Sequence, residues 1–330
     1  MLKKGAFIAG VTLLALLIVL GGSHQAVTKQ KIKIGFLVSD QLHQYILPIG
    51  IEKGYFAAEG LDVDKKEYAA AGILMQGFAA DEMDVGIVGV SGAMIAKANG
   101  TDVVIVGTQN WGGSALVVDP GIHSFEDLKD QPVANPGIGS NHHTLLTLLE
   151  RKYNTSVKKS TMKPTDMPIF ARNKEVKGVI VYEPHPTRVM KLSGFKRLFT
   201  SNQIMQDQQC CVIVVHSKMI SGQKDIIQKI TRVNAKATKF IREHKAEAIQ
   251  IIAKYSGLPV DILSEAYDNM IYPWPPRVNS ETSKILLQGI VDAGKVPKEA
   301  LTPNMDSWWN KLYNSSFEED EVKSGYLKTL

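Results

Sequence analysis

The stretch PGIGSNHHTLL, residues 136–146, combines glycines, small polar residues and the beginning of an amphipathic segment. A short apolar run, residues 132–134, precedes it, so the order predicts a strand, a tight turn and a helix whose N-cap is Ser140 or Asn141. The free N–H groups and the positive dipole end of such a helix can hold an anion. The alternative, in which Ser140 only caps its own helix, stays open at this point.

Few other residues are placed for chemistry. The only cysteines, Cys210 and Cys211, are adjacent; on a strand they would point to opposite faces, and a ring joining them would be strained. We therefore predict two free, half-buried thiols that ligand binding does not require. His142 and His143 diverge by about 100° on a helix and make poor joint metal ligands. The sequence has no CxxC, HExxH or GxSxG motif and no Walker loop, so we expect no metal, no cofactor and no catalytic residues.

The N-terminal segment, residues 1–23, has the pattern of an export signal. The basic start MLKK is followed by an uncharged apolar run and by Gly21, Gly22 and Ser23. The uncharged span, residues 5–22, is close to the shortest length that crosses a bilayer, so the segment is either a cleaved signal peptide or an N-terminal membrane anchor. Ser23 stands where a lipoprotein would carry its lipidated cysteine, which argues against lipid attachment. We expect the rest of the chain to be extracytoplasmic, either periplasmic or associated with the cell surface.

The composition is that of a globular protein. The chain has 330 residues, of which 44% are hydrophobic and 22% charged, and this is enough for one large core or two linked cores. The net charge is +5, but no long basic block is present. Nucleic-acid binding therefore has no electrostatic support.

Strand and helix patterns alternate along most of the chain. Strand patterns at 31–39, 61–68, 85–90 and 102–110 are separated by helix patterns, and a second series follows from residue 124. The two series echo each other at an offset of 92 residues, MQGFAADEMDVGIV against MPIFARNKEVKGVI. We predict two similar α/β lobes, each with a parallel sheet. From Gly222 onward the pattern is helical only, with no strand signal.

Several phrases in a fixed order resemble a known family. IEKGYFAAEGLDV, FAADEMDVGIVG, SFEDLKDQPVANPGIGS, VYEP and CCVIVV are similar to segments of the substrate-binding proteins of ABC importers, in the nitrate/sulfonate/bicarbonate and taurine group. The resemblance covers roughly residues 32–290. It implies the two-lobed type 2 periplasmic-binding-protein fold, with ligand in the cleft between the lobes. Lobe 1 would be residues 32–115 plus 212–330 and lobe 2 residues 116–211, joined by hinge crossings at 114–118 and 211–215.

Ligands of open α/β sheets bind where strands end and helices begin. Four such places in this chain, and the end of the strand before the first crossing, supply the candidate ligand-binding residues. Each has a plainer alternative: a helix cap for Ser91 and Ser140, lobe-interface packing for Trp111, and an ion pair with Arg188 for Glu183. The candidates are Asp40, His43, Ser91, Trp111, Gly139, Ser140, Asn141, His142, Glu183 and His185.

The resemblance implies a non-catalytic, monomeric protein that captures a small solute and delivers it to an ABC permease and ATPase complex. Helix N-termini and neutral donors favour an anionic group, whereas Asp40 and Glu183 would oppose a bare anion. A polar, anionic or zwitterionic solute of the sulfonate, nitrate or taurine kind fits these residues. Two alternatives stay open: binding or synthesis of a thiamine-pyrimidine precursor, and an extracytoplasmic sensor module.

Overall fold

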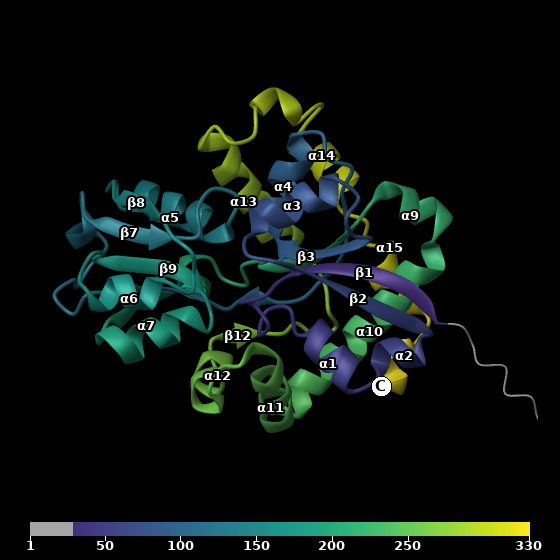
Figure 1. Ribbon diagram of the computed structural model, residues 1–330. Helices are drawn as coiled ribbons and strands as arrows, with labels where there is room; N and C mark the ends of the chain where they lie inside the picture. Colours follow the sequence, from purple (N-terminus) through teal and green to yellow (C-terminus); the bar gives the residue numbers. More distant parts are fainter. Residues whose placement is uncertain (1–28) are drawn as a thin grey trace, which may run out of the picture.

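The computed structural model describes residues 29–330, so the predicted export segment lies outside the described residues. Two five-stranded sheets lie side by side, each covered by helices (Figure 1). No helix among residues 29–330 is both long and apolar enough to cross a membrane.

The first sheet has the order β2 (Leu61–Tyr68), β1 (Gln30–Leu37), β3 (Val85–Gly89), β11 (Cys211–Val215) and β4 (Val104–Thr108). The second has the order β10 (Lys196–Thr200), β6 (Ser114–Val118), β9 (Gly178–Tyr182), β7 (Pro132–Asn135) and β8 (Lys158–Thr161).

Both sheets are mixed, whereas the sequence pattern predicted parallel ones. β1 runs parallel to β2 and β3, and β7 runs parallel to β8 and β9. β11 is antiparallel to β3 and β4, and β6 is antiparallel to β9 and β10. The reason is the path of the chain: β6 and β11 begin at the boundary between the sheets, where β3 and β9 end. The two-lobed α/β architecture itself is confirmed.

Helices cover both faces of each sheet. In the first lobe α3 (Ala71–Ala79) and α4 (Val90–Ala98) pack on one face, and α1 (Ile46–Glu52) and α10 (Lys224–Glu243) pack on the other (Figure 1). α13 contacts both α4 and α5, so an apolar cluster continues from the first lobe into the second. The helices with eight or more residues are α3 (Ala71–Ala79), α4 (Val90–Ala98), α5 (Asn141–Lys152), α7 (His185–Ser193), α10 (Lys224–Glu243), α11 (Lys245–Ser256), α12 (Val260–Tyr267), α13 (Ser280–Asp292), α14 (Met305–Leu312) and α15 (Ser316–Lys323).

Shorter helical turns connect these elements. They are α1 (Ile46–Glu52), α2 (Tyr55–Ala58), α6 (Met167–Arg172), α8 (Ser201–Ile204), α9 (Ser217–Gly222), α16 (Tyr326–Thr329) and the 3-10 turns η1 (Glu126–Leu128) and η2 (Lys298–Ala300).

The chain passes between the sheets in the residues just before β6 and β11. At the first passage β5 (Trp111–Gly112) pairs with β12 (Met270–Ile271), although no strand was predicted after residue 222. Two residues are too few to produce a periodic signal, and the pairing joins segments far apart in sequence. The same passage needs glycine: Gly113 has φ +76°, and a Cβ there would lie 2.6 Å from Met270 Sδ and 2.7 Å from His43 Cε1.

We predict that Gly113→Ala destabilises the protein more than Gly194→Ala. Both glycines have positive φ, at +76° and +73°, so both substitutions carry the left-handed backbone cost of about 1–2 kcal/mol. Only Gly113 adds a steric clash, because none of the described atoms lies within 4 Å of a Cβ at Gly194. Urea unfolding of the two variants measures the difference; an equal loss in both would contradict this account of the passage.

Candidate functional site

A cavity of about 430 Å³ lies between the two lobes. Its walls come from the end of β1, the starts of α3 and α5, the loop after β8, the end of β9 and the residues before β11. Among the predicted residues, Asp40, Gly139, Ser140, Asn141 and His142 line it. The lining does not include His43, Ser91, Trp111, Glu183 or His185. Residues of the lining that were not among the candidates include 69–73, 161–164, Tyr182, Cys210 and Cys211.

Ser140 is the N-cap of α5, as the sequence predicted. Its Oγ accepts a hydrogen bond from the His143 backbone N–H at 3.2 Å and donates to the Gly137 carbonyl at 2.7 Å. The hydroxyl proton is therefore already used inside the turn. Gly139 has φ +93°, a backbone conformation that L side chains rarely adopt, and this explains the glycine at the edge of the cavity.

Asn141 joins the two lobes. Its Oδ1 accepts from the Ser91 backbone N–H at 3.0 Å, and its Nδ2 donates to the Cys210 carbonyl at 3.2 Å. Ser91 does not line the cavity, and its backbone N–H is paired with the side chain of Asn141. Ser91 is also not the cap of α4, whose N-cap is Gly89. The buried Ser91 Oγ has no hydrogen-bond partner among the described residues.

Tyr182 is the second link between the lobes. Its hydroxyl lies 2.7 Å from Ser39 Oγ, across the cavity. Its ring lies among three imidazoles, with centroid distances of 5.8 Å to His43, 5.5 Å to His142 and 5.1 Å to His185. The sequence placed Tyr182 at the end of a strand, which was the available signal, but an aromatic residue there also fits ordinary packing.

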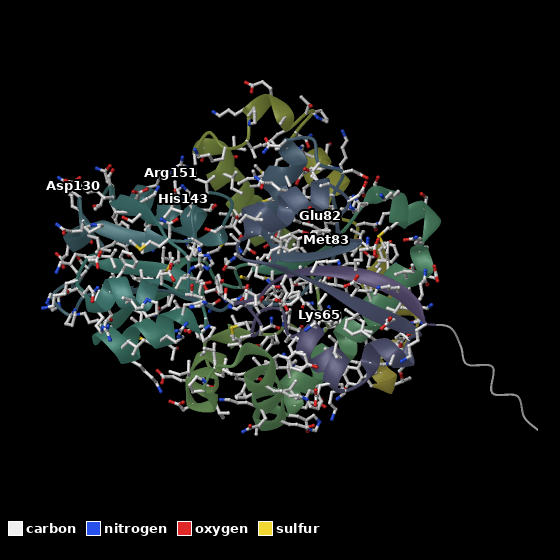
Figure 2. All side chains as sticks on the ribbon, in the orientation of Figure 1. Lys65, Glu82, Met83, Asp130, His143 and Arg151 are labelled. Carbon is white, nitrogen blue, oxygen red and sulfur yellow. The ribbon has the colours of Figure 1, made fainter. Side chains whose placement is uncertain are left out.

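Burial determines the protonation of His142 and His185. Burial lowers the pKa of each to about 3, so both imidazoles are neutral at physiological pH. His142 Nε2 lies 2.8 Å from Ser114 Oγ. The neighbouring His143, labelled on the second lobe in Figure 2, has its Nδ1 3.3 Å from Asn135 Oδ1. It does not line the cavity. The predicted divergence of the two histidines is confirmed.

Asp40 and His43 form a buried polar pair beside the cavity. Burial raises the pKa of Asp40 to about 7. Burial alone would lower the pKa of His43, but the negative charges of Asp40 and Cys210 outweigh it and raise that pKa to about 9. One carboxylate oxygen, Oδ2, accepts from Gln44 Nε2 at 3.2 Å, and the other has no hydrogen-bond partner among the described residues.

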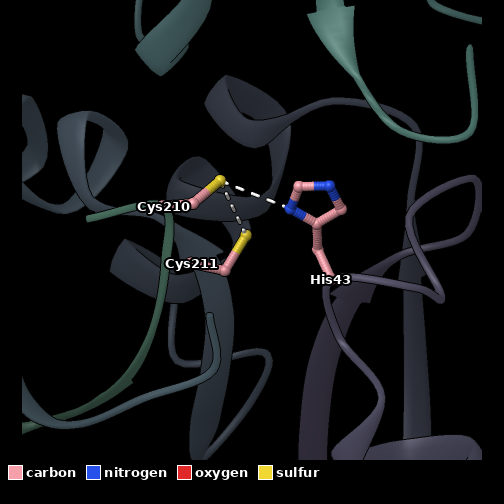
Figure 3. Close-up of side chains that lie close together, drawn as sticks. All are labelled: His43, Cys210 and Cys211. Carbon is pink, nitrogen blue, oxygen red and sulfur yellow. Dashed lines mark hydrogen bonds between the residues drawn. The ribbon is translucent and has the colours of Figure 1, made fainter. Parts of the chain in front are cut away.

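The two cysteines are free, as predicted, but they are fully buried and their thiols lie close together. The Sγ atoms are 3.9 Å apart, and Cys210 Sγ lies 3.4 Å from His43 Nδ1 (Figure 3). Cys210 precedes β11, so the alternation of a strand does not apply to the pair. Hydrogen bonding from Cys211 lowers the pKa of the Cys210 thiol despite its burial, and the same contact together with burial raises the pKa of Cys211. Among residues 29–330, His43, Cys210 and Cys211 are the one group with the donors and spacing to hold a metal ion.

Two predicted ligand residues lie outside the cavity lining and have partners within the protein. The Trp111 indole N–H donates to the Arg277 carbonyl at 3.0 Å, which holds this tryptophan at the lobe boundary. Glu183 is fully buried, and its Oε1 accepts from Arg197 and Asn269, each at 3.2 Å. The ion pair predicted with Arg188 is therefore made with Arg197 of β10.

Comparisons with known proteins agree with this architecture. The model of the NMT1-like family matches residues 25–256. A putative aliphatic sulfonates-binding protein of Escherichia coli (strain K12) is 22% identical over 229 residues, which cover 67% of this chain and 71% of that protein. The zinc-bound ligand-binding component of an ABC-type import system from Staphylococcus aureus has a TM-score of 0.76 at 18% identity, covering 88% of this chain and 99% of that one. The periplasmic nitrate-binding protein NrtA from Synechocystis PCC 6803 has a TM-score of 0.78 at 14% identity, and the match covers 90% of this chain and 89% of that one.

We predict that His142 makes the protein less stable in mild acid. The pKa of His142 is about 3 in the folded chain and 6.5 in the unfolded chain. Between these two pH values the unfolded chain binds a proton at His142 and the folded chain does not. The free energy of unfolding therefore falls as the pH drops from 6.5 toward 3. At pH 5 this costs about 2 kcal/mol. His142→Gln should therefore reduce the difference in unfolding free energy between pH 7 and pH 5 by about that amount in urea titrations. An unchanged difference would show that His142 is not held neutral.

Proposed function

The chain belongs to the NMT1-like family, and from this premise we propose that it is the extracytoplasmic solute-binding component of an ABC importer. The cavity between the lobes is the observation that carries the proposal. Its volume of about 430 Å³ lies in the range of small-molecule sites, and both lobes contribute to its walls. The E. coli and S. aureus proteins are named as binding components rather than as enzymes, which supports a non-catalytic role.

The chemistry of the walls favours a small solute with an apolar body and an anionic or zwitterionic head. The apolar wall includes Leu37, Ile73, Ile138 and Met162. Glu183 and Asp40 repel an anion less than the sequence suggested. Glu183 lies outside the lining and is paired with Arg197, and the pKa of Asp40 is about 7. An alkanesulfonate or aminoalkanesulfonate has this combination of parts.

Two features are available to hold the anionic head. α3 begins at the cavity, and its N-cap, Ala70, has no side chain that could accept a hydrogen bond from the first-turn amides. Lys163 is the one residue with a permanently positive side chain among the described lining residues. Amide donors and a single ammonium group suit a sulfonate better than they suit a cation.

Closure of the lobes is the proposed mechanism. Contacts that join the two lobes include the Tyr182–Ser39 hydrogen bond, the hydrogen bond from the Ser91 N–H to Asn141, and the ion pair between Lys191 and Asp261 at 2.9 Å. A solute that touches both lobes stabilises the closed form through its higher affinity for that form. The closed protein then presents one surface, made from both lobes, to the permease.

Calorimetric titration of the protein with taurine, butanesulfonate and nitrate tests the proposal. We expect one of the sulfonates to bind at a single site and, at a hundredfold excess over its dissociation constant, to raise the unfolding free energy by about 2.7 kcal/mol. Nitrate, which has no apolar body, should bind more weakly. Failure of every sulfonate to bind or to raise the melting temperature would count against a sulfonate-type solute.

Ser140→Ala separates capping from ligand binding at the turn. The Ser140 hydroxyl donates one hydrogen bond and accepts another within the turn. We therefore predict that Ser140→Ala lowers the free energy of unfolding by about 1 kcal/mol and changes sulfonate affinity by less than about threefold. The same titrations, made beside urea unfolding, measure both quantities. A tenfold or larger loss of affinity would instead mean that the hydroxyl contacts the solute.

A further inference from the structure

Three soft donor atoms meet beside the cavity, at the part of its floor that Cys210 and Cys211 line. Cys210 Sγ lies 3.9 Å from Cys211 Sγ and 3.4 Å from His43 Nδ1, and all three donor atoms lie within 4.8 Å of one another (Figure 3). Tetrahedral zinc bonds of about 2.3 Å to sulfur and about 2.0 Å to nitrogen require separations of about 3.8 Å between two sulfurs and about 3.5 Å between sulfur and nitrogen. The two shorter separations already match, and a small rotation of the Cys211 side chain closes the third.

The imidazole of His43 turns its Nδ1 toward the two thiols. Asn110 Nδ2 lies 3.1 Å from His43 Nδ1 and also donates to the carbonyls of Trp111 and Gly112, while Asn110 Oδ1 accepts from the Cys211 backbone N–H. Nδ1 is therefore the ring nitrogen that faces both Asn110 Nδ2 and Cys210 Sγ. A metal ion binds a neutral imidazole, so an ion at Nδ1 replaces any proton on that nitrogen. The amide keeps its two carbonyl partners if an ion replaces it at Nδ1.

An oxygen ligand and a route of entry are also present. Asp40 Oδ2 lies 3.9 Å from Cys211 Sγ, and Asp40 Oδ1 has no hydrogen-bond partner among the described residues although the side chain is only 2% exposed. Asp40, Cys210 and Cys211 all line the cavity, so an ion can reach them from it. A buried carboxylate oxygen without a partner, beside two thiols, is the arrangement that a cation would complete.

We propose that the cavity floor binds one zinc(II) or copper(I) ion through Cys210 Sγ, Cys211 Sγ and His43 Nδ1. Two thiolates and an imidazole are the ligands that these ions prefer over magnesium or calcium. Binding releases to solvent the protons that the two thiols and His43 Nδ1 carry, and Asp40 can supply the fourth ligand for zinc(II). This inference goes beyond solute capture and departs from the sequence-based expectation of no metal site, whereas the expectation that solute binding does not require the thiols stays a prediction.

Anaerobic titration of the reduced full-length chain with each ion alone tests the site, with no sulfonate present. Competition with a chromophoric chelator should give one ion per chain with a dissociation constant below the micromolar range. X-ray absorption at one equivalent of zinc should show two sulfur neighbours at about 2.3 Å. The copper(I) titration shows which of the two ions binds more tightly.

Single substitutions then assign the ligands. Because loss of a second-shell partner alone costs 10–100-fold, Cys210→Ser and Cys211→Ser should each weaken binding by roughly 100-fold or more. His216→Gln, at a buried histidine stacked on Phe78 in the first lobe, is the matched control and should bind as wild type does. Wild-type absorption spectra with only oxygen and nitrogen neighbours, or the lack of a one-to-one complex with either ion, would overturn the proposal without reference to any variant.

Discussion

The closed arrangement of the lobes depends on the need to pair polar groups where the strands of both sheets end. Asn141 meets this need at the centre of the cleft, where its amide pairs with the Ser91 N–H of one lobe and the Cys210 carbonyl. Left unpaired, the buried Ser91 N–H would cost roughly 1–3 kcal/mol, whereas the Cys210 carbonyl also accepts from the Val90 N–H at 2.9 Å. The two hydrogen bonds hold the start of α5 against the start of α4, and this places the turn at Gly139 and Ser140 over the cavity.

The same constraint explains the unusual polarity of the cavity floor. The side chains around it are buried, so His142 and His185 are neutral, and Asp40 and His43 depend on each other and on Cys210 for their charge. The charges of these side chains depend on what binds in the cavity. A bound group can pair with buried atoms that have no hydrogen-bond partner among the described residues, such as Asp40 Oδ1. A cation at the thiols and an anionic solute at the helix N-termini would compensate each other's charge.

Local signals in the sequence were sufficient for the local features. The turn glycines, the Ser140 cap and the α/β alternation follow from neighbouring residues, and the structure has all three. Features that depend on distant segments were missed. Trp111 pairs with the β12 segment, Glu183 with Arg197, and Cys210 with His43, which is 167 residues away in sequence. A strand rule predicted diverging cysteines and failed because Cys210 lies one residue outside its strand.

The central claim is that a solute between the lobes and the hydrogen bonds of Asn141 together hold the protein closed. Small-angle scattering with and without the sulfonate that stabilises the protein most, on wild type and on Asn141→Ala, tests it most directly. The account predicts that the wild type becomes more compact with solute, and that the variant is more extended without solute and regains compactness with it. Identical radii of gyration in all four samples would contradict the claim.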